Sequence, residues 1–229
     1  MSESTKSLRG IKSYVRREGR ITRAQQRALH ELWPKYGIDD GDELDFGDVF
    51  GRRSSVSVEI GFGNGDALCA LAQANPENDY LGVEVYRPGI GSLLLKLEDR
   101  GLGNVRVICD EATPVMTERI LDASLDAVYL FFPDPWPKKR HHKRRLVQRQ
   151  FVEVVARKLK PGGRFHVATD WQDYAEHVLT ITSQINGLEN IAGMGNYAQR
   201  PDYRCPTRFE RRGQKRGYRI WDVICRRTT

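Results

Sequence analysis

The chain has 229 residues, of which 39% are hydrophobic and 29% charged, a balance typical of a soluble globular enzyme and not of a disordered chain. It contains no run of about 18 apolar residues that would predict a membrane span, and its first 20 residues lack the apolar core of a secretory signal. Four cysteines stand far apart without a CxxC pair, which argues against a zinc ribbon or a disulfide scaffold and makes the cytoplasm the expected compartment.

The net charge of +7 is unevenly distributed along the chain. Three segments, 6–30, 138–149 and 199–229, together hold 25 basic and 4 acidic residues, whereas the remaining 161 residues carry a net charge of −14. A single basic run is often only a solvated surface, but three runs against an acidic remainder are typical of a protein that binds a polyanion. We therefore expect nucleic acid as the ligand of these segments.

Residues 1–50 are predicted to form a basic arm, separate from a domain at 51–229. The arm contains one expected helix at 23–32, ended by Pro34, and an acidic, turn-rich stretch at 37–47.

After the arm, short apolar runs alternate with helical stretches, which predicts a mostly parallel, doubly wound α/β sheet covered on both faces. Strands are expected at 57–61, 79–85, 105–109, 125–132 and 163–169. Helices are expected at 66–74, 90–100, 115–121 and 146–159. The final run, 218–225, predicts a strand with no helix after it, which would pair antiparallel.

The first predicted strand leads into a glycine-rich turn at 59–66, directly before a helix. Glycines at 61, 63 and 65 let the backbone turn sharply and let a ligand approach closely, although such a turn can also be purely structural. The dinucleotide fingerprint G-x-G-x-x-G is not met, because Asp66 stands at its third glycine position. Since Glu59 and Asp66 disfavour a pyrophosphate, the turn favours a cationic ligand such as S-adenosylmethionine.

Acidic residues also follow the next two predicted strands. Glu84 can accept both ribose hydroxyls of an adenosine, a feature that NAD and S-adenosylmethionine share. Asp110 and Glu111 follow the third strand, where an adenine amino group is expected, but a solvated loop is an equally good interpretation of these two acids.

The fourth predicted strand is followed by Phe-Phe-Pro-Asp-Pro-Trp at 131–136 and then by a basic run that ends at Arg145. Prolines restrict the backbone on both sides of Asp134, so its carboxylate is expected in a stiff turn. Trp136 offers a stacking face for a base, and the basic run can hold phosphates. Because ligands of open α/β sheets bind beyond the strand ends, this segment predicts an active site that receives a base of a polynucleotide.

With these motifs the sequence resembles the bacterial tRNA (guanine-N7)-methyltransferase family over about residues 13–226. The resemblance is carried by residues 58–63, 81–89, 130–136, 140–145, 165–171, 174–177, 200–201, 207–213 and 221–222. It implies a class I methyltransferase fold with a seven-stranded sheet, S-adenosylmethionine as the methyl donor, no metal, and tRNA as the partner. The implied acceptor is N7 of the guanosine at position 46 in the variable loop.

The resemblance also implies roles for individual residues. Cofactor contacts fall on Glu59, Gly61, Gly63, Glu84, Glu111 and Asp134, of which Asp134 is also the catalytic candidate. Substrate contacts fall on Lys138, Asp170, Thr207, Arg208, Phe209 and Glu210. RNA contacts fall on Arg140, His141, His142, Lys143, Arg144 and Arg145.

Two positions depart from the family pattern. The family usually has His-Asp where this chain has Asp110-Glu111, so the adenine contact can shift by one residue. It usually has Lys where Arg208 stands, which preserves the charge but not the geometry. Whether Thr207 and Glu210 recognise the base or the methionine end stays open.

The implied reaction mainly requires that guanine N7, the methyl group and the sulfur be aligned. Guanine N7 has a free lone pair and no proton, so no base is needed to create the nucleophile. As positive charge spreads into the purine, a carboxylate beside the ring stabilises it, and we expect Asp134 in this role with Asp170 as a second anchor. Arg16, Arg17 and the run at 143–145 are expected to contact phosphates.

Two other interpretations remain open. A polyamine aminopropyltransferase on a similar scaffold would also need an acidic pocket, but it has no need of three basic segments. A non-enzymatic RNA-binding protein with an inactive methyltransferase core would not need Glu59, Glu84 and Asp134. The sequence does not distinguish a monomer from a homodimer.

Overall fold

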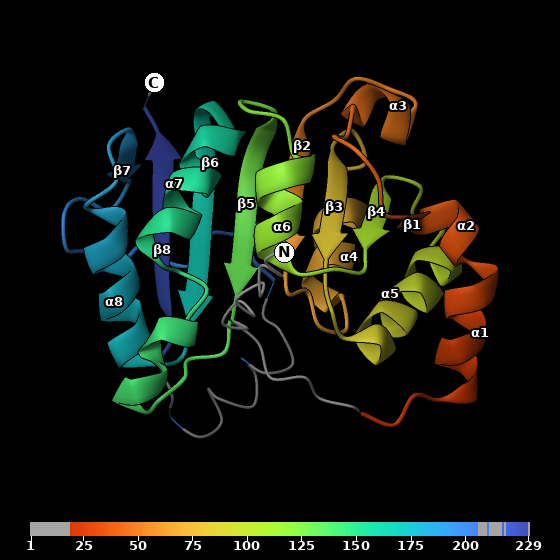
Figure 1. Ribbon diagram of the computed structural model, residues 1–229, viewed down its shortest axis with the longest axis horizontal. Helices are drawn as coiled ribbons and strands as arrows, with labels where there is room; N and C mark the ends of the chain where they lie inside the picture. The colour runs from red at the N-terminus through yellow and green to blue at the C-terminus, as the bar shows by residue number, and fades with distance from the viewer. Residues whose placement is uncertain (1–18, 206–209, 211–216, 218, 229) are drawn as a thin grey trace, which may run out of the picture.

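A computed structural model of the protein describes residues 19–205, 210, 217 and 219–228, and Figure 1 shows one mixed sheet flanked by helices. Within this part of the chain the sheet has eight strands. In spatial order they are β1 (Gly37–Ile38), β4 (Val105–Ile108), β3 (Asp79–Val83), β2 (Val56–Ile60), β5 (Leu125–Phe131), β6 (Leu159–Thr169), β8 (Trp221–Arg227) and β7 (Leu188–Asn190).

The direction in which strands are added reverses beside β2, in the middle of the sheet. β3 and β4 lie on one side of β2, β5 and β6 lie on the other, and all neighbouring pairs among these five strands are parallel. Such a reversal is the topological switch point of an open α/β sheet, where ligands bind beyond the carboxyl ends of the strands. All five residues of β2 are buried, including the acidic Glu59.

Helices cover both faces of this sheet, and two hydrophobic clusters fill the layers between them. One cluster joins the sheet to α7 (Arg149–Lys158) and α8 (Gln172–Thr182). The other joins it to α1 (Arg23–Glu31), α4 (Asp66–Ala74) and α5 (Arg87–Asp99). No helix in the described ranges is both long and apolar enough to cross a membrane. The helices are α1 (Arg23–Glu31), α2 (Trp33–Tyr36), α3 (Phe46–Phe50), α4 (Asp66–Ala74), α5 (Arg87–Asp99), α6 (Ala112–Pro114), the π-helix η1 (Val115–Arg119), the 3-10 helix η2 (Lys139–Arg144), α7 (Arg149–Lys158) and α8 (Gln172–Thr182).

The predicted fold class is confirmed, because the sheet is mostly parallel and its last strand, β8, runs antiparallel to β6. Helix α4 has the predicted bounds. Strand β6 begins at Leu159 instead of 163, because Leu159 pairs with Leu125 across an irregularity in the ladder. The expected seven strands become eight because the two-residue β1 pairs with β4. Elements α2, α3, η2, α8 and β7 were not predicted, and Pro34, expected only to end the first helix, lies within the short α2.

The residues before the glycine-rich turn contact the rest of the protein closely. A Cβ at Gly91 on α5 would lie 2.8 Å from the backbone oxygen of Gln25 on α1, so glycine permits this approach of the two helices. The turn-rich stretch at 37–47 contains β1, and the Leu44 N–H donates to the Arg119 carbonyl at 2.8 Å. The division at residue 50 into arm and domain stays a prediction, and Arg16 and Arg17 lie outside the described residues.

Candidate active site

The glycine-rich turn joins the carboxyl end of β2 to α4. Gly61, Gly63 and Gly65 have positive φ angles of 69°, 57° and 74°, which side-chain-bearing residues rarely adopt. A Cβ at Gly65 would collide with Leu93 at 2.5 Å, whereas no described atom lies within 4 Å of a Cβ placed at Gly61 or Gly63. The turn is therefore packed against α5 at its end, and its first two glycines face open space that a ligand can enter.

Glu84, which follows β3, is tied to this turn by its side chain. Its Oε2 accepts a hydrogen bond from the Gly63 N–H at 2.8 Å, and its Oε1 accepts from the N–H groups of Val85 and Tyr86 at 2.8 and 3.0 Å. Burial raises the pKa of Glu84, and the nearby negative charge of Asp134 raises it further. The fold thus brings the acid after β3, the glycine turn and the Phe-Pro-Asp segment into one electrostatic neighbourhood.

Glu59 is the buried acid of β2, two residues before the first glycine of the same turn. The side chain is buried, and its Oε2 makes no hydrogen bond within the described part of the chain. Burial, together with the negative charges of Glu84 and Asp66, raises the pKa of Glu59 to about 8. Asp66 is partly neutralised by an ion pair with Lys96. A buried acceptor without a donor is rare in folded proteins, so this carboxyl group fits a ligand that brings a donor or a positive charge.

The acids after β4 lie one strand further from the turn. The Asp110 carboxylate accepts a hydrogen bond from the Glu111 N–H at 2.7 Å, and Glu111 is the residue that precedes α6. Since β4 is the neighbour of β3, both acids stand at the same carboxyl edge of the sheet as Glu84. Within the described residues no group of three or more His, Cys, Asp or Glu side chains is placed to hold a metal ion.

The segment after β5 forms a turn with unusual backbone angles at both ends, and its stiffness stays a prediction. Phe132 and Trp136, on either side of Pro133-Asp134-Pro135, have φ angles of 53° and 47°. These left-handed conformations are unfavourable for non-glycine residues, by roughly 1–3 kcal/mol each, and persist only where the surroundings enforce them. The backbone N–H of Phe132 is held by the Ala168 carbonyl of β6 at 2.8 Å.

The basic run after this turn divides into exposed and buried members. Lys138, Arg140, Lys143 and Arg144 are exposed, and His141 and His142 are half-buried. Trp136 does not present both ring faces, because the Arg144 guanidinium lies 4.9 Å from its ring centroid and the His141 ring meets it edge-on.

Arg145 is the exception in this run, because its guanidinium faces inward. The residue is 2% exposed, its Nε–H donates to the Pro135 carbonyl at 2.9 Å, and its Nη2 pairs with Asp173 of α8. The phosphate contact expected of Arg145 stays a prediction, and these contacts engage its guanidinium inside the protein.

The expected substrate residues are partly described. Asp170 is exposed and follows β6 directly, and Lys138 precedes η2. Thr207, Arg208 and Phe209 lie outside the described residues.

Glu210 is buried, and its two carboxylate oxygens contact the two terminal nitrogens of Arg204 at 2.6 and 3.1 Å. Its carboxylate is thus engaged by the protein itself.

A buried polar network that the sequence analysis missed extends from this pair. The Nε and Nη2 atoms of Arg204 lie 2.7 and 3.1 Å from the two oxygens of Asp222 on β8. Asp222 in turn lies 2.8 Å from the His166 Nε2, and the Tyr203 hydroxyl lies 3.1 Å from the His166 Nδ1. Burial lowers the pKa of His166, so we assign a neutral ring that donates from Nε2 to Asp222 and accepts from Tyr203 at Nδ1. Polar residues inside apolar strands were the available signal.

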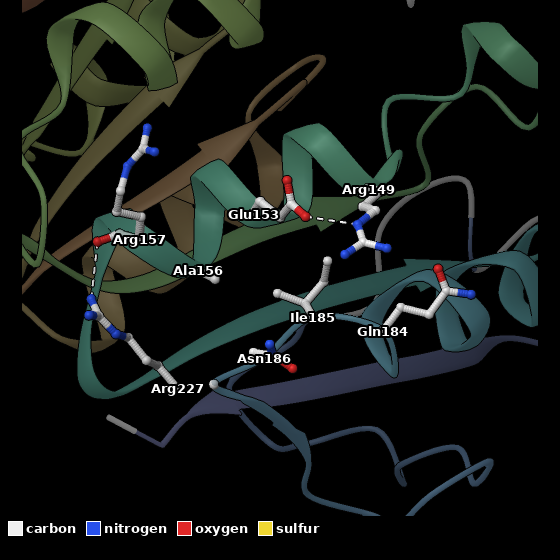
Figure 2. A pocket seen from close by; sticks show the side chains of 9 residues that line it. Arg149, Glu153, Ala156, Arg157, Gln184, Ile185, Asn186 and Arg227 are labelled. Atoms are coloured by element: carbon white, nitrogen blue, oxygen red, sulfur yellow. Dashed lines mark hydrogen bonds and ion pairs between the residues drawn. The ribbon is translucent and has the colours of Figure 1, made fainter.

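A separate hollow of about 290 Å³ lies between α7, the turn after α8 and the end of β8 (Figure 2). Its lining includes Arg149, paired with Glu153, and Arg227, which donates to the Arg157 carbonyl at 3.0 Å. The antiparallel β8 ends beside the start of β6, so this hollow lies toward the amino ends of the parallel strands. None of the predicted site residues lines it.

Comparison with known structures places the fold in a class. The 16S rRNA methyltransferase KamB matches with a TM-score of 0.61 and 14% identity, over 85% of this chain and 98% of that one. A Streptococcus mutans protein solved in complex with SAH matches with a TM-score of 0.52 and 12% identity, over 91% and 99% of the two chains. The sheet and its helices thus have the same fold as these two proteins, the first of which is named a methyltransferase.

Sequence comparison narrows this class to a family. A family model described as "Putative methyltransferase" matches residues 53–223. Proteins named tRNA (guanine-N(7)-)-methyltransferase are 53% identical in Nitrosococcus oceani, over 96% of this chain and 92% of that protein, and 52% identical in Alkalilimnicola ehrlichii, over 99% and 96%. The chain belongs to the family of bacterial tRNA (guanine-N7)-methyltransferases.

Proposed function

We propose that this enzyme transfers a methyl group from S-adenosylmethionine to N7 of a guanine in tRNA, at position 46 of the variable loop. The observation that carries the proposal is the pairing of an acidic cradle, Glu59 and Glu84 beside the glycine turn, with the rigid Asp134 turn and an exposed basic run. The family's name specifies the acceptor atom and the RNA, and favours methyl transfer over aminopropyl transfer.

The acidic side chains and the open glycine turn suit S-adenosylmethionine as a ligand. The unpartnered buried carboxyl of Glu59 would accept from its cationic methionine end, Glu84 would accept from the ribose hydroxyls, and the open side of Gly61 and Gly63 leaves room for the ligand. Glu111, beyond β4, would meet the adenine. When bound, the cofactor supplies an electrophilic methyl group on a sulfonium.

Asp134 is the residue we assign to the reacting base. Its turn is stiffened by two prolines and two left-handed residues, so the carboxylate keeps one orientation and costs little reorganisation. Placed beside the purine, it accepts from guanine N–H groups and stabilises the positive charge that the ring acquires. Asp170, exposed after the neighbouring strand β6, is the second anchor.

The exposed members of the basic run are the residues we assign to tRNA phosphates. Arg140, Lys143 and Arg144 extend from η2, directly after the Asp134 turn. A phosphate chain held there keeps its flipped or looped base at the catalytic turn. We place the enzyme in the cytoplasm, where its RNA substrate is found.

The test is methyl transfer from labelled S-adenosylmethionine to unmodified tRNA, followed by chemical mapping of 7-methylguanosine. We expect one methyl per tRNA, at guanosine 46, and none in a tRNA transcript with adenosine at that position. Labelling at another guanosine would overturn the position, and labelling of a different base atom would overturn the reaction.

A further inference from the structure

Arg145 is chemically part of the basic run but structurally separate from it. Its side chain is 1% exposed, whereas its neighbours Lys143 and Arg144 are exposed. A buried guanidinium must find internal partners, because its desolvation is costly unless it is paired and hydrogen-bonded. The partners of Arg145 therefore indicate what the residue does.

These partners come from three different segments. The Nε–H donates to the carbonyl of Pro135, the residue that follows Asp134, at 2.9 Å. The Nη2 forms an ion pair with Asp173 in α8 and lies 3.1 Å from His142 Nε2. The guanidinium also stacks on Tyr174, 4.8 Å from its ring centroid. Arg145 thus connects the catalytic turn to the helix that follows β6.

The strength of the connection follows from its chemistry. The hydrogen bond from Arg145 lowers the pKa of Asp173, which favours the ionised carboxylate of the pair. The planar guanidinium bonds to the turn and to α8 at once, which a lysine ammonium cannot reproduce with the same geometry. A strained turn with left-handed Phe132 and Trp136 needs such external support.

We propose that Arg145 is a positioning residue that fixes the orientation of Asp134 by holding the Pro135 carbonyl against α8, and that it does not contact RNA. This inference rests on the role of Asp134 in the proposed function. Loss of the bond lets the turn move, and a displacement of about 1 Å at reacting groups costs on the order of 100-fold in rate. The affinity for tRNA and its salt dependence should not change.

The experiment compares Arg145→Gln and Arg145→Lys with two matched variants. Arg144→Gln removes an exposed charge one residue away. Arg157→Gln removes a different arginine–aspartate pair, in which the Arg157 Nε lies 3.3 Å from Asp122, away from the catalytic turn. For each variant, kcat is measured at saturating tRNA and cofactor, tRNA affinity is measured across a salt series, and thermal unfolding reports folding.

For Arg145→Gln we expect kcat to fall about 100-fold, with tRNA affinity within about twofold of wild type and an unchanged salt slope. Arg145→Lys should recover part of the lost kcat. Arg144→Gln should instead reduce the salt slope by about one. An Arg145→Gln variant with near-normal kcat, or with the salt slope of Arg144→Gln, would overturn the proposal, as would equal losses of kcat in Arg145→Gln and Arg157→Gln.

A second measurement is independent of catalysis. Hydrogen exchange at the backbone amides of Asp134 and Trp136 reports opening of the turn directly. We expect faster exchange in Arg145→Gln than in wild type or Arg157→Gln, and equal exchange in all three would contradict the positioning role. If wild type did not methylate tRNA, the proposed function would fail, while this comparison would still decide whether Arg145 holds the turn.

Discussion

The acidic side chains on the two sides of the switch point differ in their partners. On the β2–β3 side, among the described residues, the buried Glu59 has one carboxyl oxygen without a hydrogen-bond partner, and the half-buried Glu84 accepts only from backbone N–H groups. On the β5–β8 side, Glu210 and Asp222 are buried against the guanidinium of Arg204. An acid that the protein pairs with its own arginine stabilises structure, whereas an acid left without a cation is available to a cationic ligand.

This contrast distinguishes acids proposed to bind the cofactor from acids that stabilise the folded protein. In the proposed function Glu59 and Glu84 receive the cofactor's positive charge and hydroxyls, while the arginine pairs connect segments of the protein to one another. Charge composition alone treats all of these acids alike, and only their partners distinguish the two roles.

The largest expected effect is on Asp134, which lies between the two sides. Asp134→Ala should lower kcat by roughly 10³-fold, the usual cost of removing a preorganised electrostatic group, with little change in tRNA affinity. Single-turnover methyl transfer measures the rate, and filter binding measures the affinity. A near-normal rate in this variant would show that Asp134 does not have the assigned role.

The paired side should respond through stability. Asp222→Asn leaves Arg204 with one anionic partner fewer in a buried site, so we expect the free energy of unfolding to fall by about 3 kcal/mol. Urea denaturation followed by circular dichroism measures this change. Glu153→Gln, at a pair with Arg149 whose two side chains are 48% and 62% exposed, is the control and should lose less than about 1 kcal/mol. Equal losses in the two variants would remove the distinction between buried and surface pairs.

On the β2–β3 side, the free energy of unfolding should depend on pH through Glu59. Because the pKa of Glu59 is raised from 4.5 to about 8 in the folded protein, the unfolded chain releases this proton at lower pH than the folded one. The contribution of Glu59 to the free energy of unfolding therefore decreases as pH rises from about 4.5 to about 8.

Glu59→Gln should abolish that decrease and stabilise the cofactor-free protein at pH 8, by on the order of 2 kcal/mol. Denaturation curves of both proteins at pH 6 and pH 8 measure the difference. A wild-type protein as stable at pH 8 as at pH 6, relative to the variant, would show that Glu59 is already ionised or has a partner.

The smallest expected effect concerns the surface. Replacing Lys143 and Arg144 together by glutamine should weaken tRNA binding and lower the salt slope by about 1.4–1.8, since each phosphate contact contributes about 0.7–0.9. The value of kcat at saturating tRNA should change little. An unaltered slope would place the tRNA backbone elsewhere on the protein.

The sequence predicted the fold where local pattern is strong. Helix α4 lies between a glycine turn and Asn75, and a turn does form at Phe-Pro-Asp-Pro-Trp, where proline restricts the backbone locally. The two-residue β1 was missed because it has too few residues to show a period, and its pairing with β4 depends on distant contacts.

The candidate site shows the same limit. Arg145 has the same charge as Arg144, and only the fold turns one inward and the other outward. The bond between His166 and Asp222 spans 56 residues of sequence, so spacing could not reveal it. Local motifs found the acids and the turn, but which acids have internal partners is a property of the folded chain.

The most direct test of the central contrast is calorimetric titration with S-adenosylmethionine at pH 7.5 in buffers of different ionisation enthalpy. Wild type should bind the cofactor and release a substantial fraction of one proton, because a bound cation ionises Glu59, whereas Glu59→Gln should bind at least tenfold more weakly and release none. Equal affinity and equal proton release in the two proteins would contradict the assignment of the unpartnered acid to the cofactor.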